Sequence, residues 1–186
     1  ILRADFFIDL HSTGSDGEVV QLCGYNMGSG PAAELRRRVA EAFHARVIWA
    51  HPTQPPGRSL SFALEHDIPA IYTECPAGRW VSLSDSAVYQ RGVRNAMRVL
   101  GMLEGDLEGP PSEFYWGAEW NEDVTIYTTQ TGFFIPDCEV YQEVEAGQVL
   151  GRVYDLTGAV LEEIRAPVAG FVGVRWKLPT CYAGDP

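Results

Sequence analysis

Two apolar segments of this sequence each end with a side chain that can bind a metal or transfer a proton. His11 follows "FFIDL" at 6–10, and Glu74 lies at the end of "IPAIYTEC" at 68–75. Ligands and reactive groups of parallel sheets gather beyond the carboxyl ends of the strands, so we predict that both lie at one sheet edge. His11 is a possible metal ligand and Glu74 a possible general base. Position alone also allows His11 to be a structural histidine bonded to backbone.

Neighbouring charged residues allow alternative roles for both side chains. Asp9 would point to the same side of a strand as His11, where it could orient the imidazole or simply end the strand. A buried glutamate needs a partner, so Glu74 could instead form an ion pair with Arg58 or Arg79.

A cysteine and three further histidines have weaker claims. Cys75 could be a thiolate nucleophile with His11 as its base, but it follows Glu74 directly and should face the core instead. His44 and His66 end predicted helices, where a cation suits the helix dipole. His51 begins a proline-containing loop and could reach the site.

Strands and helices alternate over the first part of the chain. Apolar periodicity predicts strands at 4–10, 19–24, 46–50 and 68–75, and helices at 31–45, 59–66 and from 84 or 85 to about 104. This alternation predicts an α/β fold with a parallel or mixed sheet that helices cover on both sides. Ser59 is the expected N-cap of the second helix.

The pattern changes after a segment rich in Gly, Pro and acidic residues at 105–113. Such a composition predicts a linker. Short strands separated by glycine turns follow, among them "VTIYTT" at 124–129 and "GFFIP" at 132–136, and they predict a small all-β barrel or sandwich. We therefore expect a partial α/β domain at 1–104, a linker at 105–113 and a β-domain at 114–186.

Part of the predicted β-domain resembles biotinyl and lipoyl carrier domains. The resemblance is carried by "EAGQVLG" and "APVAGFV" within residues 144–173. Carriers attach their cofactor to a lysine on the hairpin between these halves, but the only lysine of this chain is Lys177, beyond the second half. We therefore expect a structural or gating module rather than a swinging arm.

Charge and cysteine content narrow the range of partners. The chain has 186 residues and a net charge of −11, which argues against a nucleic-acid surface or an anionic membrane surface. No apolar run is long enough to cross a bilayer. The four cysteines contain no C-x-x-C pair, so a zinc knuckle is not expected and reduced thiols in a cytoplasmic protein are the default. The sequence starts without methionine, and we expect a fragment of a longer protein.

Three segments together resemble the succinylglutamate desuccinylase/aspartoacylase family. They are "FIDLHS" at 7–12, "SLSFALEHDIPAIYTECPAG" at 59–78 and the carrier-like part that ends in "APVAGFVG" at 166–173. Members of this family are zinc-dependent deacylases related to the metallocarboxypeptidases. The resemblance covers most of the chain, rests mainly on the order of the segments, and implies a carboxypeptidase-like mixed sheet followed by the β-domain.

The resemblance also implies roles for individual residues. His11 matches a zinc ligand, and Glu74 matches the glutamate that promotes attack of a zinc-bound water on an amide. The family's other two ligands form an H-x-x-E motif upstream, which this sequence lacks. We therefore expect weak zinc binding, if any, and no activity from this chain alone.

The implied substrate is a small N-acyl amino acid or related N-acyl amine, whose carboxylate family members hold with arginine. Arg58 and Arg79 have suitable chemistry, although neither matches a family motif. A non-catalytic binding module with the same fold is the alternative. The sequence does not indicate the oligomeric state.

Overall fold

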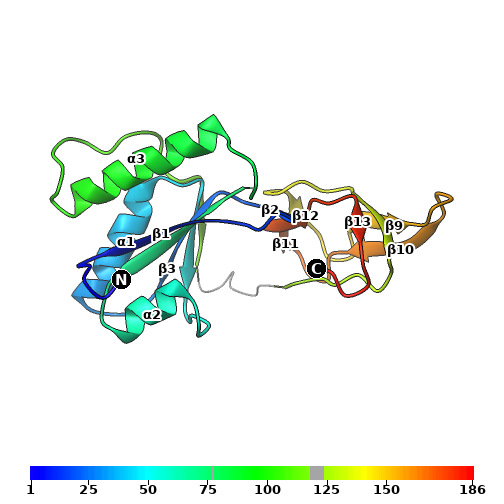
Figure 1. Cartoon of the computed structure of the whole chain (residues 1–186), viewed down its shortest axis with the longest axis horizontal. Helices are drawn as coiled ribbons and strands as arrows, with labels where there is room; N and C mark the ends of the chain where they lie inside the picture. Colours follow the sequence, from blue (N-terminus) through cyan, green and yellow to red (C-terminus); the bar gives the residue numbers. More distant parts are fainter. Residues whose placement is uncertain (77, 118–123) are drawn as a thin grey trace. The chain divides into compact units, whose positions relative to one another are not determined.

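The computed structural model of the chain describes residues 1–76, 78–117 and 124–186. It contains two compact units, which are drawn in Figure 1. Of the described residues, the first unit comprises 1–12, 21–76 and 80–117, and the second comprises 13–20, 78–79 and 124–186.

The first unit is built on a mixed five-stranded sheet with the strand order β1-β5-β3-β4-β6. The strands are β1 (Phe7–Ser12), β3 (Leu22–Asn26), β4 (Val47–His51), β5 (Ala70–Cys75) and β6 (Phe114–Trp116). β1 is parallel to β5, β3 is antiparallel to β5, and β3, β4 and β6 run parallel to one another. The predicted mixed α/β fold is therefore confirmed for this unit.

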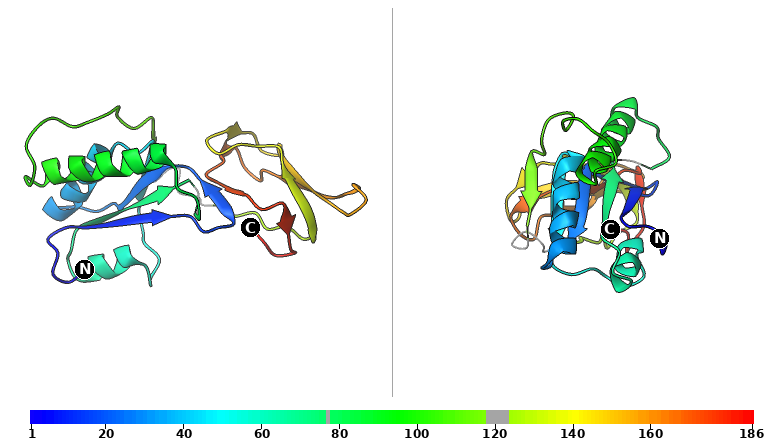
Figure 2. Two further views of the ribbon diagram at one scale, coloured as in Figure 1. Left: turned by 45° about the horizontal axis from the view of Figure 1, so that its top comes forward. Right: turned by 90° about the vertical axis from the view of Figure 1, so that its left-hand side faces the viewer.

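Helices cover both faces of this sheet (Figures 1 and 2). The helices are α1 (Pro31–Phe43), α2 (Ser59–Glu65) and α3 (Leu83–Val99). Phe43 of α1 and Ile71 of β5 lie in one core cluster with residues of α3, and both are completely buried. Leu60 of α2 belongs to a second cluster, with Phe7 of β1 packed against it. Burial of each such side chain contributes about 1.5–3 kcal/mol.

The third helix is shorter than its apolar pattern predicts. It begins after Ser82, whose Oγ accepts a hydrogen bond from the backbone N–H of Asp85 at 3.2 Å. It ends at Val99 rather than near 104, because Gly101 adopts a left-handed conformation with φ of 73°. A glycine in this conformation is a common way to end a helix.

The segment 105–113 is part of the first unit, so the predicted linker is wrong. Glu108 forms ion pairs with Arg94 and Arg98 of α3, both at 2.7 Å. Its backbone N–H and C=O bond the side chain of Asn95, which is completely buried. β6 then pairs with β4. The sequence pattern shows the composition of this segment but not these contacts.

The second unit consists of strands and turns in the part that the structure describes. Its strands are β2 (Gly17–Val19), β7 (Gly132–Pro136), β8 (Glu143–Val144), β9 (Val149–Tyr154), β10 (Val160–Arg165), β11 (Gly170–Phe171), β12 (Val174–Trp176) and β13 (Thr180–Cys181). They form a four-stranded sheet, β10-β9-β7-β13, and the pairs β11-β8 and β12-β2. Pairing with β12 places residues 13–20 in this unit rather than in the predicted first domain. A closed barrel or sandwich stays a prediction.

The strand predicted at 124–129 does not form. The hydroxyl of Thr128 and the backbone N–H of Thr129 instead donate hydrogen bonds to the Glu162 carboxylate, at 2.7 and 2.9 Å. The backbone N–H of Thr128 also donates to the C=O of Asp185 at 2.9 Å, and its C=O accepts from the N–H of Gly184 at 2.8 Å. β9 and β10 are joined by a turn in which Asp155 accepts a hydrogen bond from the backbone N–H of Thr157 at 2.8 Å.

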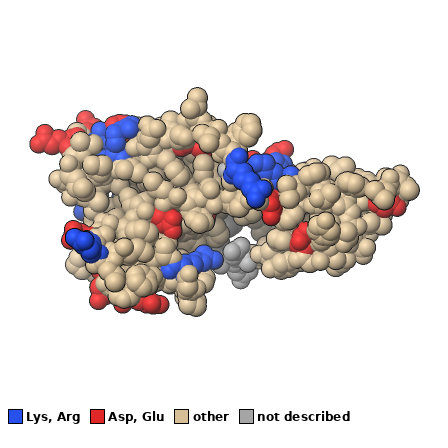
Figure 3. Space-filling model, viewed as in Figure 1, with Lys and Arg blue, Asp and Glu red and all other residues tan. Residues whose placement is uncertain are grey.

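The surface carries charges of both signs. On the face of the first unit visible in Figure 3, the basic side chains, all of them arginines, are scattered among acidic ones. None of the helices in the described ranges is long and apolar enough to cross a membrane.

The ion pairs of Glu108 predict how stability depends on pH. Hydrogen bonds from Arg94 and then Arg98 lower the pKa of Glu108 to about 2. A lowered native pKa stabilises the fold above the unfolded pKa of about 4.5, and this contribution is lost as the pH falls toward 2. Glu108→Gln should therefore make stability less dependent on pH in this window, as measured by urea unfolding.

Glu104→Gln is the matched control, because Glu104 is exposed and lies four residues before Glu108, just ahead of that segment. It should leave the pH dependence of the wild type unchanged. An equal pH dependence for Glu108→Gln and the wild type would show that these ion pairs contribute nothing.

Candidate active site

His11 and Glu74 lie side by side at the carboxyl ends of two parallel strands. The register of β1 and β5 places His11 directly opposite Glu74. Residues opposite each other in a sheet point to the same face. β3 begins at the same edge, where Leu22 lies opposite Glu74. The structure therefore brings together the two residues predicted from the sequence, with His11 inside the strand rather than just beyond it.

Asp9 connects His11 to the start of α2. Its Oδ1 lies 3.7 Å from His11 Nδ1, which is an ion-pair distance rather than a hydrogen bond. Its Oδ2 accepts a hydrogen bond from the hydroxyl of Ser59. The His11 side chain is 61% exposed, so the imidazole is accessible while Asp9 faces its Nδ1. Because Asp9 faces Nδ1, we take Nε2 as the candidate ligand atom of His11.

Glu74 is a half-buried carboxylate with an unusual environment. Burial raises its pKa, and Asp9 raises it further, while the charges of His11 and Arg58 oppose the shift. Its Oε2 is buried and has no hydrogen-bond partner among the described residues. Glu74 and Arg58 form no ion pair, so that alternative is not realised. A carboxylate with a raised pKa and an unpaired oxygen is suited to accept and return a proton.

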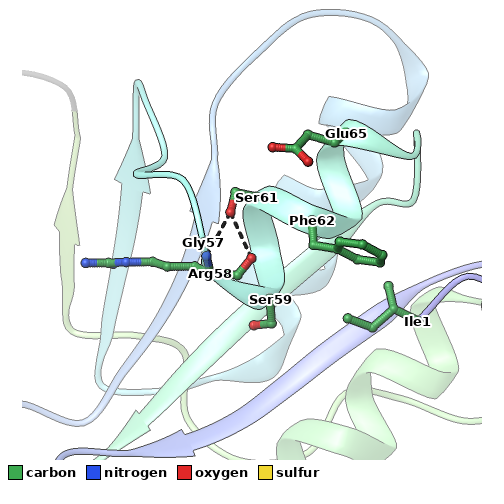
Figure 4. A pocket seen from close by; sticks show the side chains of 7 residues that line it. All are labelled: Ile1, Gly57, Arg58, Ser59, Ser61, Phe62 and Glu65. Atoms are coloured by element: carbon green, nitrogen blue, oxygen red, sulfur yellow. Dashed lines mark hydrogen bonds between the residues drawn. The ribbon is translucent and has the colours of Figure 1, made fainter.

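Arg58, rather than Ser59, is the N-cap of α2. The Ser61 hydroxyl accepts a hydrogen bond from the backbone N–H of Arg58 at 2.9 Å and donates to its C=O at 2.8 Å. These bonds free the Ser59 side chain to reach Asp9. Figure 4 shows a pocket at this end of α2, with the Arg58 side chain extending away from Phe62. The guanidinium is near enough to affect Glu74 electrostatically.

Arg79 belongs to the second unit, and its role as a substrate ligand stays a prediction. Cys75 follows Glu74 in β5 and therefore faces the side of the sheet covered by α1 and α3. Burial is the main cause of the raised pKa of Tyr89 on α3, and Cys75 adds to it. The pairing of Cys75 with His11 as nucleophile and base is thus not supported.

The remaining histidines fall into two groups. His44 and His66 cap α1 and α2, and their Nδ1 atoms bond the backbone oxygens of Glu108 and Phe62, so both are structural. His51 is different, because its Nε2 bonds the hydroxyl of Tyr72 at 2.8 Å. Tyr72 lies two residues before Glu74 on the same face of β5. We did not predict Tyr72 or Ser59 as site residues, although the two-residue spacing from Glu74 was a usable signal for Tyr72.

The side chains present provide only part of a metal site. The described ranges contain no group of three or more His, Cys, Asp or Glu residues that could hold a metal ion. His11 offers one nitrogen, and the unpaired Oε2 of Glu74 lies on the adjacent strand. A catalytic zinc takes three protein ligands, so these residues fit one ligand position and one base position.

Sequence comparison identifies a distant curated relative, whereas no family model matches the chain. The relative is the N-alpha-acetyl-L-2,4-diaminobutyric acid deacetylase of Halomonas elongata, which is 25% identical over 197 residues. The match covers 98% of this chain and 54% of the relative. The chain thus spans about half the length of this relative.

Several solved structures share the fold of this chain. The product-bound ectoine utilization protein EutE (DoeB) of Ruegeria pomeroyi matches with a TM-score of 0.88 and 23% identity. The match covers 98% of this chain and 56% of the EutE chain. A succinylglutamate desuccinylase of Silicibacter sp. TM1040 has a TM-score of 0.88 and 21% identity, with 99% and 57% covered. The succinylglutamate desuccinylase/aspartoacylase of Rhodobacter sphaeroides has a TM-score of 0.83 and 22% identity, with 100% and 57% covered. The resemblance to the succinylglutamate desuccinylase/aspartoacylase family is therefore confirmed, and the chain has the fold that these solved structures share.

Proposed function

We propose that this chain is part of an amide hydrolase that removes the acyl group from a small N-acyl amino acid or related N-acyl amine. The observation that carries the proposal is the pairing of His11 and Glu74 at the ends of two adjacent parallel strands. The deacetylase and desuccinylase names of similar proteins support the same reaction class. Because the chain spans about half of those proteins, the proposal concerns the longer protein that contains it.

Glu74 is the proposed general base. Its unpaired oxygen would accept a proton from the attacking water, and the resulting carboxylic acid would return it to the leaving amine nitrogen. Its raised pKa favours holding that proton between the two steps. Burial is the main physical cause of this property, and Asp9 contributes to it.

His11 is the proposed zinc ligand, through Nε2, with Asp9 orienting the ring from the Nδ1 side. A zinc ion at this position would lower the pKa of a bound water to about 7 and polarise the amide carbonyl. The other two ligands would come from an H-x-x-E motif, which these 186 residues do not contain. Arg58 is the proposed partner of the substrate carboxylate, because a guanidinium binds a carboxylate through two parallel hydrogen bonds.

A non-catalytic binding module is the second candidate function. The incomplete donor set within the described residues favours it. The two candidates differ in the sequence of the longer protein, since an H-x-x-E motif there supports the hydrolase and its absence supports the binding module.

Substitution of Glu74 in the longer protein tests the hydrolase directly. Glu74→Gln should lower turnover of N-alpha-acetyl-L-2,4-diaminobutyric acid about 100- to 10,000-fold, because the general base is removed, while the zinc content stays unchanged. His11→Ala should lower the zinc content as well. Amine release and metal analysis measure the two properties, and unchanged turnover of Glu74→Gln would disprove the proposed base.

The same substitution should increase stability at neutral pH. A raised native pKa means that stability falls as the pH rises from the unfolded pKa of Glu74 through its native pKa. Glutamine removes this cost, so the free energy of unfolding at pH 7 should be higher for Glu74→Gln than for the wild type. Glu65→Gln, at an exposed position of α2, is the control and should change little. A less stable Glu74→Gln variant would show that the carboxylate is well accommodated.

A further inference from the structure

The Tyr72 side chain lies across the neighbouring strand β3. It can do so because the residue beneath it on β3 is a glycine. Gly24 of β3 is opposite Tyr72 in the register. A Cβ added at Gly24 would lie 2.0 Å from Tyr72 Cε1 and 2.8 Å from its hydroxyl oxygen. The phenol ring therefore rests directly on the backbone of β3 instead of standing up from the sheet.

Contacts with β4 and with α2 hold the ring in this position. Beyond Gly24, the Tyr72 hydroxyl and His51 Nε2 of β4 are 2.8 Å apart and hydrogen-bonded. Tyr72 also packs against the apolar cluster that includes Leu60 of α2. The ring is thus fixed at both ends, by α2 and by β4, although it is only half-buried.

Tyr72 shares one face of β5 with the candidate base. Tyr72 precedes Glu74 by two residues, so both side chains are on one face of β5, about 7 Å apart along the strand. The rings of His51 and Trp49 extend the surface, with centroid distances of 5.7 Å from Tyr72 to His51 and 4.8 Å from His51 to Trp49. These three rings, which we call the aromatic floor, form a row from β5 to β4 on the face of the sheet that carries Glu74.

We propose that Tyr72 is a specificity-determining residue that presents its ring to the ammonium group of an N-acyl diamino acid. The proposal rests on the amide-hydrolase function proposed above and names the substrate class of the same site. An aromatic ring attracts a cation that lies within about 6 Å of its centroid. With the acyl amide beside Glu74 and the substrate carboxylate on Arg58, a side-chain ammonium is the group left to occupy this floor.

The charges near Glu74 favour the same ligand. Asp9 and Glu74 are carboxylates on this face, and Arg58 would be neutralised by the substrate carboxylate. An anionic side chain would meet these carboxylates and the negative face of the ring, whereas an ammonium would be attracted to both. An aliphatic side chain would gain only apolar contact.

Equilibrium binding to the longer protein tests the inference without requiring turnover. The Glu74→Gln background prevents hydrolysis during calorimetry. The probes are N-alpha-acetyl-L-2,4-diaminobutyric acid and N-acetyl-L-norvaline, which replaces the ammonium by a methyl group of similar size. We expect the ammonium probe to bind about fivefold tighter or more. Tyr72→Leu should abolish this preference, and Tyr72→Phe should retain part of it because the ring remains.

Tyr115→Phe is the matched control. Tyr115 is on β6 and its hydroxyl contacts that of Tyr25, on the opposite face of the same sheet, so the preference should not change. Equal affinities of the two probes for the Tyr72-containing protein would overturn the inference, as would a full preference in Tyr72→Leu. If the longer protein with Glu74 intact bound the ammonium probe with this preference but did not hydrolyse it, only the proposed hydrolase function would be contradicted.

Discussion

The parallel pairing of β1 with β5 is the constraint on which the candidate site depends. Its register places the His11 imidazole opposite the half-buried Glu74 carboxylate, and a shift by one residue would send one of them to the other face of the sheet. Burial then raises the pKa of Glu74, and Ser59 fixes Asp9 beside His11. α2 contributes twice, because it supplies Ser59 at its start and packs against Tyr72. Sheet register and one short helix thus define most of the chemistry.

The residues that could be predicted from the sequence are those with a strong local signal. Apolar strands that end in a polar side chain identified His11 and Glu74, and strand alternation indicated that Asp9 shares a face with His11. Helical periodicity located α1 and α2 to within a few residues. These features depend on spacing within one segment, and such spacing is visible without knowledge of the fold.

The features that could not be predicted depend on contacts between distant segments. The acidic segment at 105–113 has the composition of a linker, but Asn95 and two arginines bind Glu108 to α3. "VTIYTT" has strand composition, but no strand forms there: the Thr128 backbone bonds residues 184 and 185, and the Glu162 carboxylate binds Thr128 and Thr129. In the sequence Tyr72 looks like an ordinary strand residue. Only the fold shows that its ring lies on the backbone of Gly24. Local patterns cannot reveal such partners, since they lie in other segments of the chain, as Gly24 does 48 residues before Tyr72.

The central claim is that His11 binds a catalytic metal while Glu74 remains free to transfer protons. The most direct measurement is a crystal structure of the longer protein with zinc, in which anomalous scattering locates the ion. Our account predicts a zinc ion about 2.0–2.1 Å from His11 Nε2, with the Glu74 carboxylate near it but not among its ligands. A zinc ion bound by other residues without His11, or one ligated directly by Glu74 in place of a water, would contradict it.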